Sequence, residues 1–176
     1  MTPEKEKEIL ELEARRKVFD TVKHYSGSHF REIERKSGLS VGSVKFHLDS
    51  LTRNGLIVMQ KDGNNIRYFS RDIEIKNSVL LGLLRQDSVR KILIYMLTHK
   101  NFNHEDITNE VGLSPSTVSW HIKKLEENDI IIAERRGRKT FYRLLADKSE
   151  ILNLLVIYKE SFFDKMVDHA IEMWEM

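Results

Sequence analysis

Residues 112–128, GLSPSTVSWHIKKLEEN, contain the signals that end one helix and begin another. Gly112 suits a left-handed residue that closes a helix, because glycine adopts that conformation at little cost. Ser114 is placed to cap the next helix by accepting from its first free amides. Pro115 fits the first helical position, where the missing N–H costs nothing. The stretch therefore predicts two helices joined by a tight turn.

The helix that begins at Pro115 has one apolar face. At about 100° per residue, Val118, Ile122 and Leu125 fall within a narrow arc, which we expect to be buried. Trp120 then points nearly opposite, into solvent. His121 falls on the shoulder of the helix, nearer the buried face. Trp120 and His121 are thus expected to have different roles, although they are adjacent in the sequence.

The surrounding sequence completes a compact unit. Upstream, RKILIYMLTHK (90–100) and HEDITNEVG (104–112) have helical patterns. Downstream, IIIAE (130–134) and TFYRL (140–144) are typical of two strands that flank a turn at Gly137. Short helices joined by a glycine turn and followed by a hairpin form the winged helix-turn-helix arrangement.

The same unit occurs earlier in the chain. When Gly38 is placed over Gly112, residues 16–72 align with residues 90–146 without a gap, at an offset of 74. Phe46 then lies over Trp120, and a histidine follows each of them. Two copies are too few for a solenoid, so we interpret the chain as two copies of one domain.

The expected fold is mainly α with small β-hairpin wings, an α+β chain of tandem winged helix-turn-helix domains followed by a C-terminal amphipathic helix. The domain boundaries are an N-terminal domain with a leading charged helix at 1–72, a linker helix at 73–89, a second domain at 90–146 and the terminal helix at 147–176. The apolar stripe of that helix predicts a dimer interface, formed by Leu155, Tyr158, Phe162, Phe163, Met166 and Trp174.

Composition narrows the class of protein further. The 176 residues are 40% hydrophobic and 32% charged, without the apolar run of roughly 18 residues that a membrane span requires, so a cytoplasmic protein is expected. The absence of cysteine excludes disulfides and thiolate metal sites. Residues 147–176 are acidic, which leaves the remainder of the chain basic and suited to a polyanion.

A family resemblance rests on SPSTVSWHIKKLEENDII (114–131) followed by RRGRKTFYRL (135–144). These segments resemble the recognition helix and wing of ArsR/MarR-like transcription regulators, and the duplication resembles archaeal proteins with two winged-helix domains per chain. The resemblance implies binding to DNA, and it mildly favours repression.

The candidate DNA contacts lie in the recognition helices and the wings. From the helices they are Ser43, Lys45, Phe46, His47, Ser116, Thr117, Ser119, Trp120, His121, Lys123 and Lys124. From the wings they are Lys61, Asn64, Asn65, Arg67, Arg135, Arg136, Arg138, Lys139 and Arg143. For Phe46 and Trp120 the alternative is packing against another part of the chain or a second subunit. For the histidines the alternative is packing on the helix shoulder.

Enzyme chemistry is not expected. The sequence has no glycine-rich phosphate loop, no G-x-S-x-G motif and no histidine cluster with metal-ligand spacing, so neither a cofactor nor a metal is predicted. The predicted function is a sequence-specific, double-stranded-DNA-binding transcription regulator located in the cytoplasm at the nucleoid. We expect a repressor that binds a pseudo-palindromic site as a homodimer. The alternatives are an architectural DNA-binding protein with weak sequence preference and a winged-helix protein-interaction module.

Overall fold

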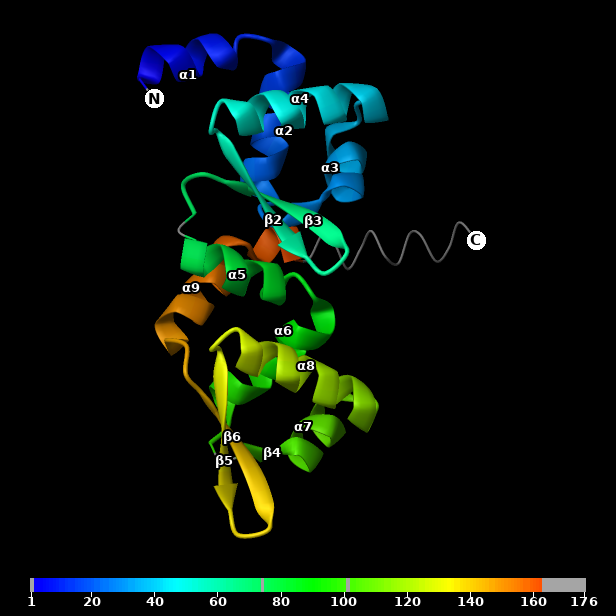
Figure 1. Cartoon of the computed structure of the whole chain (residues 1–176), viewed down its shortest axis with the longest axis vertical. Coiled ribbons are helices and arrows are strands. Elements are labelled where there is room, and N and C mark those ends of the chain that lie inside the picture. The colour runs from blue at the N-terminus through cyan, green and yellow to red at the C-terminus, as the bar shows by residue number, and fades with distance from the viewer. Residues whose placement is uncertain (1, 74, 101, 163–176) are drawn as a thin grey trace. The chain divides into compact units, whose positions relative to one another are not determined.

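The computed structural model describes residues 2–73, 75–100 and 102–162. These residues divide into two compact units, one formed by the described residues up to 78 together with 158–162, and the other by the described residues from 79 to 157. Figure 1 shows the same order of helices and strands in each unit. The predicted fold class, mainly helical with small antiparallel wings, is confirmed.

The first unit contains a helix-turn-helix and a small sheet. Its helices are α1 (Pro3–Ile9), α2 (Glu13–His24), α3 (Phe30–Ser37) and α4 (Val41–Arg53), and its strands are β1 (Ser28–His29), β2 (Ile57–Asp62) and β3 (Asn65–Ser70). The strands form an antiparallel sheet in the order β1-β3-β2, with Ile57 opposite Ser70 and Asp62 opposite Asn65. Strand β3 is therefore central.

The second unit repeats this plan. Its elements are α6 (Asp87–Thr98), β4 (Phe102–Asn103), α7 (His104–Val111), α8 (Pro115–Glu127), β5 (Ile131–Arg136), β6 (Lys139–Leu144) and α9 (Lys148–Ile157). The sheet order is β4-β6-β5, and Arg136 lies opposite Lys139 at the hairpin tip. The β5–β6 hairpin extends away from the helices of its unit (Figure 1). Helix α5 (Ile75–Leu84) spans the point where the two units divide.

The turn signals read from the sequence are confirmed. Gly38 and Gly112 have φ angles of 63° and 66°, so each closes its helix in the left-handed conformation. The side chain of Ser40 accepts from the backbone N–H of Ser43, and Ser114 accepts from Thr117 in the same way. These caps fix where each recognition helix begins.

The short strands β1 and β4 were not expected. The sequence predicted a two-stranded wing, and each sheet has a third strand of two residues. A strand this short has no periodicity that a pattern could detect. Because the short strand pairs with one edge of the inner strand, β3 and β6 each lie between two strands.

Each unit has its own apolar core. In the first, side chains of α2, α3 and α4 pack with the beginning of β2, and Val18, Ile33, Val44 and Leu51 are fully buried. In the second, the equivalent Ile92, Ile107, Val118 and Leu125 are fully buried. Val118, Ile122 and Leu125 therefore form the buried face of α8, as predicted.

The structural repeat also includes the segment before each three-helix unit. Arg16 donates from Nε to the carbonyl of Leu10, and the equivalent Arg90 donates from Nη1 to the carbonyl of Leu84, at 3.2 and 3.0 Å. The buried guanidinium of Arg90 also bonds Asp87 at 2.7 Å. The same side-chain-to-backbone contact thus ties down the turn before α2 and the turn before α6.

Among the described residues, no helix combines the length and the apolar character needed to cross a membrane.

Candidate nucleic-acid interface

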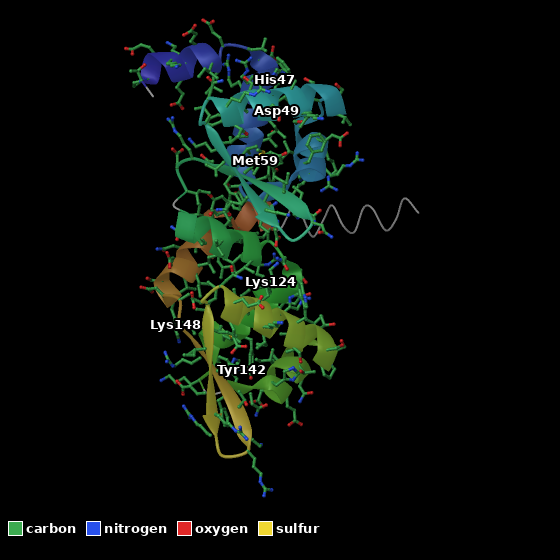
Figure 2. All side chains as sticks on the ribbon, viewed as in Figure 1. His47, Asp49, Met59, Lys124, Tyr142 and Lys148 are labelled. Carbon is green, nitrogen blue, oxygen red and sulfur yellow. The ribbon has the colours of Figure 1, made fainter. Side chains whose placement is uncertain are left out.

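Helix α8 presents a polar outer face around one large aromatic residue. Trp120 is 57% exposed, and Ser116, Ser119 and Lys123 are exposed beside it. The ammonium of Lys124 lies 5.4 Å from the centre of the indole, within cation–π range. Figure 2 labels Lys124 on this helix. Thr117 is half-buried in the first turn, next to its cap. A helix of this kind offers hydroxyls, ammonium groups and an apolar ring to a groove.

The histidine that follows each exposed aromatic is buried. His121 is 6% exposed and His47 is 5% exposed. In each case Nδ1 is buried without a hydrogen-bond partner among the described residues. Burial lowers the pKa of both imidazoles, and the nearby cations Arg15 at His47 and Lys124 at His121 lower it further.

This burial corrects the predicted contact set. The sequence placed His47 and His121 on the helix shoulder and included both among the DNA contacts. A ring that is almost wholly covered by its own domain has little surface to offer to DNA, so we no longer include either histidine. Each ring instead packs edge-on beneath the exposed aromatic before it, Phe46 or Trp120.

Helix α4 presents a different face. Phe46 is 62% exposed, and Lys45 is exposed next to it, but the position of Lys123 is taken by Asp49, which is also exposed. Figure 2 labels His47 and Asp49 on this helix. Ser43 is half-buried, and its backbone N–H is used by the cap. The first recognition helix is therefore less basic than the second.

The second wing is strongly basic. Residues 131–144 contain five basic side chains and one acidic one, and all five basic side chains are exposed. Glu134 accepts from Arg143 at 2.8 Å and from Arg136 at 3.0 Å, and these hydrogen bonds lower its pKa. Among the described residues, Arg138 and Lys139 have no acidic partner. The tip of the hairpin therefore carries uncompensated positive charge.

The first wing is nearly neutral. Lys61, Asn64 and Asn65 are exposed at its tip, as predicted, with Asp62 beside them. Arg67 is only 5% exposed, because it donates from Nε to Asp62 at 2.7 Å and from Nη1 to the carbonyl of Gly27 at 2.8 Å. The predicted DNA contact by Arg67 is therefore withdrawn, since its guanidinium is used inside the domain.

The position equivalent to Arg67 carries an aromatic ring. In the second domain Phe141 occupies that position, and the guanidinium of Arg136 lies 5.4 Å from its ring centre. The partly buried salt bridge between Arg67 and Asp62 in the first wing is thus replaced by a cation–π contact in the second. This replacement leaves the second wing with the larger positive charge at its surface.

One polar contact at this surface was not anticipated. Nε2 of His104, the first residue of α7, lies 2.8 Å from the hydroxyl of Ser119 on α8. No role was predicted for His104 from the sequence. The position of His104 in the sequence could have indicated this contact, because the first turn of α7 lies beside the recognition helix in a helix-turn-helix.

The predicted dimer residues fall into two groups. Leu155 and Tyr158 are half-buried and Phe162 is buried, whereas Phe163, Met166 and Trp174 lie outside the described residues. Helix α9 instead exposes Leu152, Val156 and Ile157, which had been assigned no place in the interface.

Comparison with protein families agrees with this geometry. Residues 85–132 match the family model described as winged helix-turn-helix DNA-binding, and residues 12–78 match a model described as an N-terminal HTH domain. The second matched segment is thus a winged helix-turn-helix DNA-binding domain, and the first is a helix-turn-helix domain. The first match covers the whole first repeat, whereas the second covers the helices of the second repeat and ends at residue 132, at the start of its wing.

One relative is similar to this chain over most of the chain's length. An HTH-type transcriptional regulator of Methanocaldococcus jannaschii is 28% identical over 138 residues, which cover 78% of this chain and 34% of the relative. The chain thus spans about one third of that relative's length.

Solved structures similar to part of the chain include HlyU of Vibrio cholerae and the transcriptional repressor BigR of Xylella fastidiosa. HlyU is 24% identical, covering 47% of this chain and 91% of HlyU, with a TM-score of 0.43. BigR is 20% identical, covering 47% of this chain and 82% of BigR, with a TM-score of 0.41.

Proposed function

We propose that this chain is a transcription regulator that binds specific sites on double-stranded DNA, with the second domain supplying most of the affinity. The observation that carries the proposal is the difference between the two wings. Residues 131–144 have five basic side chains and one acidic one, whereas residues 57–70 have two basic and one acidic. Charge concentrated beside a recognition helix favours contact with phosphates.

In this proposal the two parts of the second domain have separate tasks. Arg135, Arg138 and Lys139 at the wing tip neutralise phosphates, and Arg138 is the candidate for insertion into the minor groove. Ser116, Ser119, Trp120 and Lys123 on α8 face base edges in the major groove. The first domain, with Lys45, Phe46 and Lys61, makes fewer charged contacts and adjusts the register on the site.

A homodimer is the assembly that we propose. Leu152 and Val156 lie one helical turn apart on α9, and Val156 is 73% exposed. Large apolar side chains left open on one helix favour contact with a second copy, and a twofold pair presents two α8 helices to a pseudo-palindromic site. The interface then includes Leu152, Val156 and Ile157 with the half-buried Leu155 and Tyr158 of the predicted stripe, whereas Phe162 is buried within its own chain.

Repression by blocking promoter access is the simplest outcome of such binding. A regulator of this kind acts at the nucleoid, in the cytoplasm. The function requires no catalysis or cofactor, because binding alone excludes other proteins from the site.

The test is selection of bound duplexes from a random DNA pool, with the mass of the complex measured in parallel. We expect one enriched motif with twofold symmetry and a mass of two chains per site. Affinity for that motif should exceed affinity for random DNA by about 10³-fold or more. A smaller ratio would indicate an architectural role. Affinity that is insensitive to salt would indicate a protein-interaction module.

A further inference from the structure

Two helices of the second domain are joined by a side-chain hydrogen bond at the proposed DNA surface. Nε2 of His104 and the hydroxyl oxygen of Ser119 are 2.8 Å apart, and the two residues are separated by 15 positions in the chain. Ser119 is exposed on α8. This bond places a histidine of α7 in control of a hydroxyl on the recognition helix.

The backbone that carries His104 is firmly held. The side chain of Asn103 accepts from the N–H groups of Glu105 and Asp106, at 2.8 and 3.1 Å, and Asp106 accepts in return from the N–H of Asn103 at 2.8 Å. This capping box satisfies the first amides of α7 and fixes its first turn. The imidazole is therefore presented to Ser119 from a rigid support.

The other ring nitrogen determines which tautomer is present. Nδ1 of His104 lies 3.4 Å from the hydroxyl oxygen of Thr108, while that hydroxyl lies 2.7 Å from the backbone carbonyl of His104. A hydroxyl has one proton, and the shorter contact to the carbonyl takes it. Nδ1 can then form a hydrogen bond with Thr108 only as the donor, and this contact favours the neutral tautomer in which Nε2 has no proton and accepts.

The hydroxyl proton of Ser119 is therefore taken up by the hydrogen bond to His104. Because Nε2 is an acceptor, the hydroxyl of Ser119 donates to it and offers only lone pairs outward. We propose that His104 fixes Ser119 as a hydrogen-bond acceptor, so that α8 selects a base with an exocyclic amino group at the position that Ser119 faces. In the major groove those groups are N6 of adenine and N4 of cytosine. This inference rests on the proposed function, and His104 acts in it as a positioning residue.

The first domain has no such pair. At an offset of 74, His104 is replaced by Phe30 and Ser119 by Lys45. The repeat therefore supplies a shape-matched substitution, His104→Phe, which keeps an aromatic ring at the start of α7 and removes both nitrogens. Ser119→Ala removes the hydroxyl and leaves the histidine in place.

The first arm of the test needs no DNA. Nitrogen-15 chemical shifts of the His104 ring, recorded on the full chain above the range in which histidine titrates, should show a protonated Nδ1 and an unprotonated Nε2. In Ser119→Ala the Nε2 signal should move, because its donor is gone. A protonated Nε2 in the unaltered chain overturns the inference, whatever the chain binds.

The second arm repeats the random-pool selection with the unaltered chain and both variants. The unaltered chain should prefer adenine or cytosine at one position of its motif. That preference should fall by about 2- to 10-fold in each variant, the range of a single neutral hydrogen bond. In His104→Phe, affinity for scrambled duplex and melting temperature should stay the same. An unchanged base preference in either variant overturns the inference and leaves the proposed function intact. Absence of any motif for the unaltered chain overturns both.

Discussion

The indole of Trp120 and the imidazole of His121 meet edge to face, with ring centroids 4.9 Å apart and planes at 71°. Phe46 and His47 are related in the same way, at 5.2 Å and 71°. In both domains the first ring is exposed and the second is buried. Adjacent residues on one helix thus have different environments, one ring open to solvent and the other packed within its own domain.

Replacement of Trp120 by alanine should change sequence preference without unfolding the domain. The indole is mostly exposed, so its removal creates no large cavity in the core. We expect the enriched motif to lose specificity and the melting temperature to change little, as judged by pool selection and circular dichroism. Phe46→Ala is the matched control in the first domain. A large fall in melting temperature for Trp120→Ala would show that the ring is structural.

Replacement of Arg138 by alanine should weaken binding to every duplex by a similar factor. Loss of one phosphate contact should also reduce the slope of log affinity against log salt by about 1. Fluorescence anisotropy over a range of salt concentrations measures both effects. Asn64 occupies the same position in the first wing, so Asn64→Ala should leave the slope unchanged. A loss confined to one DNA sequence would contradict a phosphate contact by Arg138.

The buried histidines predict a loss of stability in mild acid. The pKa of His47 and of His121 is lowered in the folded chain from the ordinary value of 6.5. As the pH falls below about 6.5, the unfolded chain takes up protons that the folded chain does not, so the free energy of unfolding decreases. Above that pH these two groups add no pH dependence. Urea unfolding at pH 5.5 and pH 7.5 measures the difference.

Histidine variants of this chain test whether the two buried rings cause the difference between the two pH values. The double variant His47→Gln/His121→Gln should lose part of the difference in unfolding free energy between the two pH values. His24 is exposed, so His24→Gln should retain it. An equal difference in all three proteins would mean that the two buried rings do not titrate differently on unfolding.

The backbone conformation of Asp129 predicts that its replacement by glycine stabilises the fold. It has a positive φ angle of 55°, and the equivalent residue of the first domain is Gly55, with φ of 67°. A left-handed conformation is strained for a residue with a Cβ, although aspartate tolerates it better than most. Asp129→Gly should therefore raise the free energy of unfolding by a few tenths to about 1 kcal/mol. Gly55→Asp should lower it, and urea unfolding tests both. A stabilised Gly55→Asp variant would contradict the argument.

Local signals were sufficient for most of the fold. The turn and cap residues act through the conformation of their own backbone and the amides next to them, as Gly38, Ser40, Gly112 and Ser114 show. Their effect can therefore be predicted from the neighbouring residues in the sequence. The helical period placed Trp120 outside for the same reason. It placed His121 only on the shoulder, because the depth of burial depends on what other elements cover that face.

Arg67 illustrates what a local pattern cannot provide. Four consecutive residues of β3, from Arg67 to Ser70, are buried, which breaks the alternation expected of a strand with one exposed face. The strand is central, with β1 on one edge and β2 on the other. Strand β1 comes from a segment some 40 residues earlier, and Gly27 beside it accepts from the Arg67 guanidinium.

The sequence by itself determined the repeated helix-turn-helix and wing, the ends of each helix, and the greater charge of the second wing. These properties follow from backbone preferences and composition, which act over a few residues. Only the tertiary structure decided that Arg67, His47 and His121 are buried and that His104 controls Ser119. Those outcomes depend on contacts between segments distant in the chain, where burial and hydrogen bonding are set by the partner that folding brings near.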